Sequence, residues 1–169
     1  IPGFGFGTGH HPTTQAAIAL ISDYASEYTP TTSRAPVLDL GTGSGVLALA
    51  AQRLLGIPVV AVDNDPLAIA NARENLSINK VDEVALVVGT AACLGAHQFQ
   101  LIVANLYAEV LIELVSAIGT LSQSGSELIL AGIMSEKDSN VIQAYQSSFW
   151  RVRARIEREG WVAYRLTRK

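Results

Sequence analysis

Three glycines, Gly41, Gly43 and Gly45, alternate with single residues shortly after the acidic residue Asp39. Glycine at alternate positions allows the backbone to turn tightly and to approach a ligand without a clash from a Cβ atom. Asp63 follows Gly41 by 22 residues, and its carboxylate can accept hydrogen bonds from both hydroxyls of a ribose. The loop and the acid together predict a nucleoside-binding site, with a tight turn that binds no ligand as the alternative.

The spacing of these glycines indicates which nucleoside the loop binds. Dinucleotide-binding loops carry their third glycine one residue later, at the position of Val46, where a side chain obstructs the close approach of helix and strand. Asp39 repels a diphosphate but attracts an ammonium group. S-adenosylmethionine has an ammonium group, a ribose and no phosphate, so we expect it as the cofactor, with NAD and an oxidoreductase as the alternative. The residues expected to bind it are Asp39, Gly41, Gly43, Gly45 and Asp63.

The composition is that of an ordinary globular protein. The chain has 169 residues, of which 49% are hydrophobic and 16% charged, enough for one domain with its own core. Its single cysteine, Cys93, excludes a disulfide framework and a cysteine-based zinc site. His10 and His11 have no acid or third histidine at ligand spacing, so no metal site is expected. Because no apolar run reaches the roughly 18 residues of a membrane span, we expect a cytoplasmic protein that does not bind membranes.

Basic residues are concentrated at the end of the chain. Residues 151–169 contain seven Lys and Arg against two Asp and Glu, whereas residues 1–150 contain five against thirteen. Arg151, Arg153 and Arg155 alternate with apolar residues, which is the period-two pattern of a strand with one face in water. We therefore predict a solvated strand and no direct binding of nucleic acid, with a patch for an anionic partner as the alternative.

Apolar runs and turn residues alternate along the chain in the manner of an α/β protein. Thr13 or Thr14 is expected to cap a first helix that continues to Tyr28. Strands are then predicted near residues 36–40, 58–62, 83–88, 100–104 and 127–131, and helices near 46–55, 66–79, 107–119 and 135–147. Gly56 is expected to end the helix near 46–55 and Asp65 to cap the helix near 66–79, and Cys93 is expected in the loop after the third strand. Two last strands, 149–157 and 161–167, are separated by a short turn and should pair antiparallel. This order predicts a doubly wound, Rossmann-like α/β fold with a seven-stranded, mostly parallel sheet and an antiparallel C-terminal hairpin strand.

Several segments resemble known methyltransferase motifs. Residues 37–45 and 63–66 resemble motif I and the acidic post-motif of class I methyltransferases. Residues 6–14, Phe-Gly-Thr-Gly-His-His-Pro-Thr-Thr, resemble the signature of the ribosomal protein L-eleven methyltransferases, the PrmA family. Residues 104–108, Ala-Asn-Leu-Tyr-Ala, and the closing strand from Gly160 are also similar to that family, and the resemblance covers nearly the whole chain.

The resemblance implies an activity and a set of contacts. The family transfers methyl groups from S-adenosylmethionine to lysine side chains and an N-terminal amine of one ribosomal protein, so a ribosomal protein is the implied partner. Its cofactor contacts fall on Thr14, Gly41, Asp63 and Asn105. The side-chain carbonyl of Asn105 can also accept an N–H from the amine and direct its lone pair at the methyl group, which makes Asn105 the expected catalytic residue. A plain helix cap at Thr14 and a structural role for Asn105 are the alternatives.

Other features leave the acceptor open. His10, Thr42 and Tyr107 depart from the family's usual residues, but none removes an implied contact. The family's enzymes carry an N-terminal domain that binds the ribosomal protein, and residues 1–169 are expected to form a single methyltransferase domain without it. Residues 3–14, with four glycines, are expected to form a lid over the cofactor. The alternative functions are a methyltransferase of a small molecule or RNA and a non-catalytic cofactor-binding module.

Overall fold

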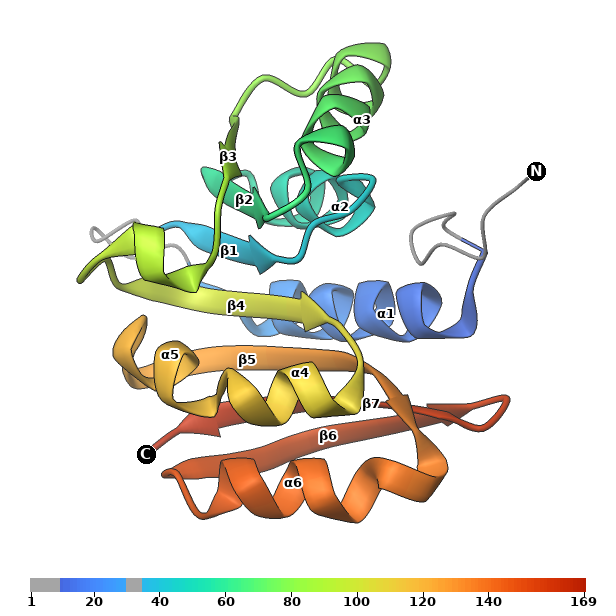
Figure 1. Ribbon diagram of the computed structural model, residues 1–169, viewed down its shortest axis with the longest axis vertical. Helices are drawn as coiled ribbons and strands as arrows, with labels where there is room; N and C mark the ends of the chain where they lie inside the picture. Colours follow the sequence, from blue (N-terminus) through green and yellow to red (C-terminus); the bar gives the residue numbers. More distant parts are fainter. Residues whose placement is uncertain (1–9, 30–34) are drawn as a thin grey trace.

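The structure is a computed structural model that describes residues 10–29 and 35–169. These residues form one seven-stranded sheet with helices on both faces (Figure 1). Residues 3–9 of the predicted lid and residues 6–9 of the signature lie outside the described residues. The strands are β1 Val37–Leu40, β2 Val59–Asp63, β3 Val84–Val88, β4 Phe99–Asn105, β5 Ser122–Met134, β6 Trp150–Arg158 and β7 Trp161–Arg168.

The sheet is parallel except at its C-terminal end. In the strand order β3-β2-β1-β4-β5-β7-β6, β1 pairs in parallel with β2 and β4, β2 with β3, and β4 with β5. β7 lies antiparallel between β5 and β6, and a two-residue turn at Glu159 and Gly160 joins it to β6. The predicted fold, a mostly parallel doubly wound sheet with an antiparallel C-terminal hairpin strand, is confirmed.

Helices cover the two faces of the sheet in two groups (Figure 1). One face carries α1 (Pro12–Glu27), α2 (Val46–Leu55) and α3 (Pro66–Ile78); the other carries α4 (Ala108–Glu113), α5 (Val115–Thr120) and α6 (Asp138–Gln146). Two short 3-10 helices are η1 (Ala91–Leu94) and η2 (Ser135–Lys137). The central strands are buried on both faces, which is why they are continuous apolar runs in the sequence.

The order of the strands reverses next to β1, and this reversal positions the candidate site. β2 and β3 lie on one side of β1, and β4 and β5 lie on the other. At such a point the connections after adjacent strands separate and leave a crevice at the carboxyl ends of the strands. The loop of residues 41–45, which follows β1, and the segment from Leu106, which follows β4, both lie at this point.

Local signals set two of the helix ends as predicted. Asp65 caps α3 by accepting a hydrogen bond from the amide of Leu67 at 2.8 Å, and Gly56 ends α2 with a φ of +63°. α1 differs from the prediction, because its cap is His11, whose Nδ1 accepts from the Thr13 amide, and neither threonine is the cap. The proline after His11 already has the φ of a first helical residue, which moves the start of the helix forward.

Four predicted segments differ from their prediction. The helix expected over residues 135–147 begins as the 3-10 helix η2 and continues as α6. The helix expected over residues 107–119 is divided into α4 and α5 at Leu114, where a ψ of −6° departs from the helical value. The loop expected around Cys93 contains the 3-10 helix η1. β5 is longer than residues 127–131, because its first residue pairs with β4 and its last residues pair with β7. Pairing with neighbouring strands therefore extends β5 beyond the apolar run that predicts it.

Candidate functional site

The glycine loop between β1 and α2 has a backbone that glycine alone adopts readily. Gly41, Gly43 and Gly45 have φ angles of +75°, +54° and +80°. The end of β2 holds the loop, because the amides of Gly41 and Thr42 both donate to the carbonyl oxygen of Val62, at 2.8 and 3.0 Å. The predicted turn is therefore present and is attached to the neighbouring strand.

Close packing by α3 supports the loop from a second side. A Cβ atom on Gly45 would lie 3.0 Å from the Cβ of Ala72, so glycine at this position lets α3 approach the loop. From the same helix, the Nδ2 of Asn75 donates to the carbonyl oxygen of Ser44 at 2.9 Å. These contacts hold the loop in one shape before any ligand binds.

Asp63 ends β2 and is held at both carboxylate oxygens. Its Oδ2 accepts a hydrogen bond from the amide of Gly43 at 2.9 Å, and its Oδ1 accepts one from the amide of Asp65 at 3.0 Å. Each carboxylate oxygen can accept a further hydrogen bond. The structure thus brings the predicted ribose acid against the predicted glycine loop and leaves it with acceptor capacity.

Asp39 also lies at the loop, where it holds the loop together. Its side chain is buried, and its Oδ2 accepts from the Oγ1 of Thr42 at 2.6 Å and from the amide of Ala48 at 2.9 Å. Burial raises the pKa of the Asp39 carboxyl group from 3.8 to about 6, and the two hydrogen bonds offset only part of this effect. Asp39 lines neither of the two cavities at the crevice, so its contact with a ligand ammonium stays a prediction.

Two cavities of about 190 Å³ each open at the crevice beside β1. Gly41, Asp63 and Leu106 line both of them, so the two cavities are neighbours that share these residues. The first cavity is also lined by Asn105, and the second by residues 89–91, which follow β3. Residues at the carboxyl ends of four neighbouring strands therefore line this pair of cavities.

Two of the predicted site residues carry a buried oxygen atom that has no hydrogen-bond partner among residues 10–29 and 35–169. These atoms are the Oδ1 of Asn105 and the Oγ1 of Thr14, in the first turn of α1. Asn105 is one of the residues that line the first cavity, and its Oδ1 is buried on the side of Gly132. A buried polar atom without a partner costs about 1–3 kcal/mol, and a ligand that donates a hydrogen bond to it would remove this cost. Thr14 lines neither cavity, and its contact with a cofactor stays a prediction.

Leu106 is a site residue that the sequence patterns did not identify. It lines both cavities, and a Cβ atom on Gly41 would lie only 2.5 Å from its Cδ2. The sequence does carry one signal for Leu106, which is its position directly after Asn105 and β4. Residues that follow parallel strands border the crevice. Of the predicted residues, Gly41, Gly43, Asp63 and Asn105 do come together around the first cavity.

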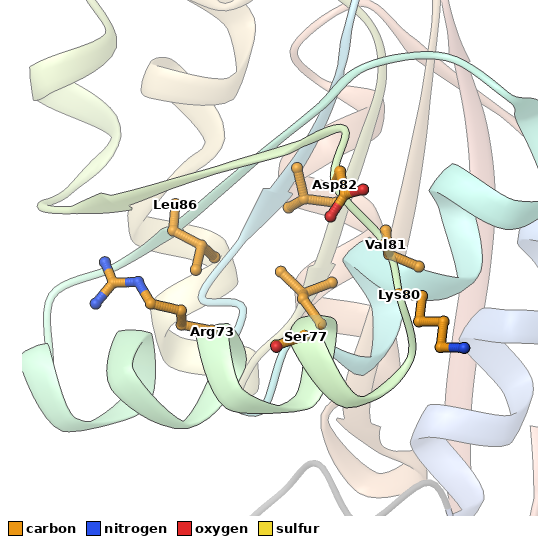
Figure 2. Close-up of a pocket in the computed structure, with 8 residues that line it drawn as sticks. Arg73, Ser77, Lys80, Val81, Asp82 and Leu86 are labelled. Carbon is orange, nitrogen blue, oxygen red and sulfur yellow. The ribbon is translucent and has the colours of Figure 1, made fainter.

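A wider groove of about 670 Å³ lies between α3 and β3, away from the glycine loop (Figure 2). Its side chains include Arg73 and Lys80, which extend in opposite directions in Figure 2. Ligand sites bring a few polar groups together on one point. Because the charged side chains of this groove do not converge, we do not regard it as the candidate site.

Residues 10–29 and 35–169 contain neither a cluster of metal-ligating side chains nor a helix that could span a membrane. No three His, Cys, Asp or Glu side chains come together there as a metal ion requires. His11 binds the Oγ1 of Thr13 through its Nδ1 at 2.8 Å, and the Sγ of Cys93 donates to the carbonyl oxygen of Thr90 at 2.9 Å. None of the helices described is long and apolar enough to cross a membrane.

Comparison with known sequences gives one family. The family model described as ribosomal protein L11 methyltransferase (PrmA) matches residues 1–169. The ribosomal protein L11 methyltransferase of Brucella abortus (strain S19) is 42% identical over 171 residues, which cover 98% of this chain and 58% of that protein. The protein of the same name from Chelativorans sp. (strain BNC1) is 41% identical and is covered to 57%. The chain thus spans less than two thirds of the length of these relatives.

Solved structures agree with this comparison. The ribosomal protein L11 methylase from Lactobacillus delbrueckii subsp. bulgaricus has a TM-score of 0.83 and 28% identity, over 95% of this chain and 81% of that one. An RNA methyltransferase from Salinibacter ruber, solved in complex with S-adenosyl-L-homocysteine, has a TM-score of 0.70 and 19% identity, over 93% of each chain, and shares the fold. Since the family model matches the whole length and a relative is 42% identical over 98% of it, this chain belongs to the ribosomal protein L11 methyltransferase (PrmA) family.

Proposed function

We propose that this chain is the catalytic domain of an S-adenosylmethionine-dependent N-methyltransferase. The observation that carries the proposal is the pair of neighbouring cavities that share Gly41, Asp63 and Leu106, with Asn105, whose Oδ1 is unpartnered among the described residues, in the lining of the first. Two small neighbouring cavities that share a carboxylate in their lining suit a nucleoside that carries a polar arm. Membership in the family supports the same cofactor.

We assign the two parts of this cofactor to the two cavities. The second cavity is lined by the apolar side chains of Val110 and Leu114 and by residues 89–91. We assign the flat adenine ring to this cavity, where the backbone of residues 89–91 can bind the edge of the ring. Asp63, in the lining of both cavities, accepts the hydrogen bonds of the ribose hydroxyls. The first cavity takes the methionine part and directs it toward Asn105.

The chemistry assigned to the protein is alignment and removal of water. S-adenosylmethionine supplies an electrophilic methyl group on its sulfonium. A lysine amine has an ordinary pKa of ~10.4, and burial beside apolar side chains such as Leu106 favours its neutral, nucleophilic form. The carbonyl oxygen of Asn105 accepts an N–H from this amine and holds its lone pair in line with the methyl group.

We propose an amino group of a ribosomal protein as the acceptor, because relatives of this chain are named ribosomal protein L11 methyltransferases. Contacts of the basic tail favour a protein acceptor over RNA. Arg155, Arg158, Arg165 and Arg168 each donate to groups within the chain, so these charges already serve the fold. A ribosomal acceptor would place the reaction in the cytoplasm.

Calorimetric titration with S-adenosylhomocysteine tests the cofactor assignment. We expect the wild-type chain to bind at one site, and Asp63→Ala to bind about tenfold or more weakly, because each hydrogen bond to a charged acceptor contributes roughly 1.5–3 kcal/mol. Asp82→Ala, which changes an exposed acid in the groove between α3 and β3, is the matched control and should bind as the wild type does. Equal affinity of Asp63→Ala and wild type would contradict the ribose assignment.

Transfer of a labelled methyl group tests the acceptor. Purified ribosomal protein L11 and ribosomal RNA are incubated separately with the chain and S-adenosylmethionine that carries a tritiated methyl group. We expect label on protein amines. Label on RNA alone would overturn the proposed acceptor, and binding of S-adenosylhomocysteine without any labelled product would indicate a non-catalytic module.

A further inference from the structure

β5 contains a bulge beside the end of β4. Leu130 pairs with Tyr164 of β7, and Ile133 pairs with Val162, so two residues of β5 face a single residue of β7. The second of these two residues is Gly132, whose φ is +84°. A bulge changes the direction of a strand and re-aims the groups around it, and bulges are common next to active sites.

The segment that carries Asn105 fills the space beside Gly132. A Cβ atom on Gly132 would overlap the carbonyl oxygen of Leu106 and would lie 3.0 Å from the Oδ1 of Asn105. The amide of Leu106 donates to the carbonyl oxygen of Ala131 at 3.1 Å, so the bulge also binds this segment through the backbone. The shape of the bulge therefore determines where the side-chain oxygen of Asn105 lies.

The glycine loop holds Leu106 from its other side. The Cδ2 of Leu106 lies 2.5 Å from the place that a Cβ atom on Gly41 would take. Leu106 thus occupies the gap between two glycines, with its side chain on Gly41 and its carbonyl group against Gly132. A side chain at position 132 would displace the backbone of Leu106 and, with it, the neighbouring Asn105.

We propose that Gly132 is a positioning residue for methyl transfer. Its lack of a side chain lets the β5 bulge hold Leu106 against Gly41, and this arrangement fixes the Oδ1 of Asn105 where the acceptor amine approaches the methyl group. The inference rests on the proposed function and extends it to a residue that lines neither cavity. Gly132 acts through Asn105 and touches no reacting atom.

Binding of two different ligands tests the position of Asn105 separately from the binding of the cofactor. S-adenosylhomocysteine lacks the transferable methyl group, whereas sinefungin carries a protonated amine in its place, which can donate to the Oδ1 of Asn105. In Gly132→Ala, the affinity for sinefungin should fall about tenfold or more, while that for S-adenosylhomocysteine changes less than about threefold. Calorimetric titration of each ligand measures both affinities.

Gly125→Ala is the matched control for backbone strain. Gly125 lies in the same strand with a φ of +85°, and a Cβ atom there would meet no atom within 4 Å. This variant strains the backbone as Gly132→Ala does but creates no clash, so its ratio of the two affinities should equal that of the wild type. The proposal would be overturned if Gly132→Ala lost equal affinity for both ligands. It would also be overturned if Gly125→Ala changed the ratio of the two affinities as Gly132→Ala does.

Leu106→Ala provides a second test if Gly132→Ala does not fold. This change removes atoms and creates no clash, but it releases the segment from Gly41, so sinefungin should again lose more affinity than S-adenosylhomocysteine. An unaltered ratio in Leu106→Ala would contradict the proposal. A wild-type chain that binds neither ligand would instead refute the proposed function on which the inference rests.

Discussion

Asp39 is a carboxylic acid that is only 1% exposed, beneath the glycine loop. It accepts hydrogen bonds from Thr42 and Ala48, but burial outweighs them and raises its pKa from 3.8 to about 6. Folding therefore favours the protonated form of this group. Its contribution to stability is complete below a pH of about 4 and is lost as the pH rises through about 6.

The substitution Asp39→Asn should remove this pH dependence. An asparagine keeps an oxygen that can accept from Thr42 and Ala48, but it does not ionise. The free energy of unfolding of the variant, minus that of the wild type, should rise by on the order of 3 kcal/mol between about pH 4 and pH 7. Urea unfolding at both pH values measures it. A difference that does not vary with pH would mean that Asp39 does not titrate in this range.

Among the secondary-structure elements, the hairpin of β6 and β7 has a strained turn. Its turn residues, Glu159 and Gly160, have φ angles of +51° and +78°. Two positive angles are typical of a type I′ turn, whose twist matches that of the flanking strands. Glycine adopts such an angle readily, whereas glutamate does so at a cost because its Cβ crowds the backbone. Asparagine is the residue most often found before glycine in this turn.

The substitution Glu159→Asn should therefore stabilise the protein by about 0.5–1 kcal/mol. For a chain of this size, each kcal/mol raises Tm by roughly 2–4 °C, which thermal unfolding detects. Glu159→Gln is the control, because it removes the same charge without favouring the turn. If both variants raised Tm equally, the loss of charge rather than the turn conformation would be responsible.

At the scale of the whole molecule, Arg165 joins segments that are far apart in the sequence. It lies in β7, is 3% exposed, and donates to Glu127 of β5 and to Asp23 and Glu27 of α1 at 2.7–2.8 Å. Its guanidinium group also lies 5.3 Å from the centre of the Tyr24 ring. This side chain therefore attaches the first helix to the C-terminal half of the sheet.

Loss of this side chain should destabilise the whole fold. Arg165→Met leaves the buried Glu127 without its cation, and removal of one partner of a buried ion pair costs about 3–5 kcal/mol. We expect the lower end, because Asp23 and Glu27 are half exposed. Arg155→Met, which breaks exposed ion pairs, is the control and should cost about 1 kcal/mol or less. Urea unfolding that gave equal losses in both variants would contradict the assigned role.

The sequence by itself determined the features that depend on neighbouring residues. Alternation of apolar runs predicted the seven strands, and Asp65 and Gly56 predicted two helix ends, because caps and turns depend on residues a few positions apart. The glycine loop and Asp63 were predicted for the same reason, since a βαβ unit places the ends of its two strands side by side.

Only the tertiary structure decided which groups face one another across the sheet. The burial of Asp39, the contact of Leu106 with Gly41 and the bulge at Gly132 depend on strand order and register, which bring together residues far apart in the sequence. The contacts of the basic C-terminal residues also depend on the tertiary structure, because the acidic partners of Arg165 lie in α1 and β5. Spacing along the chain carries the signal for local hydrogen bonds, whereas long-range contacts are set when the sheet assembles.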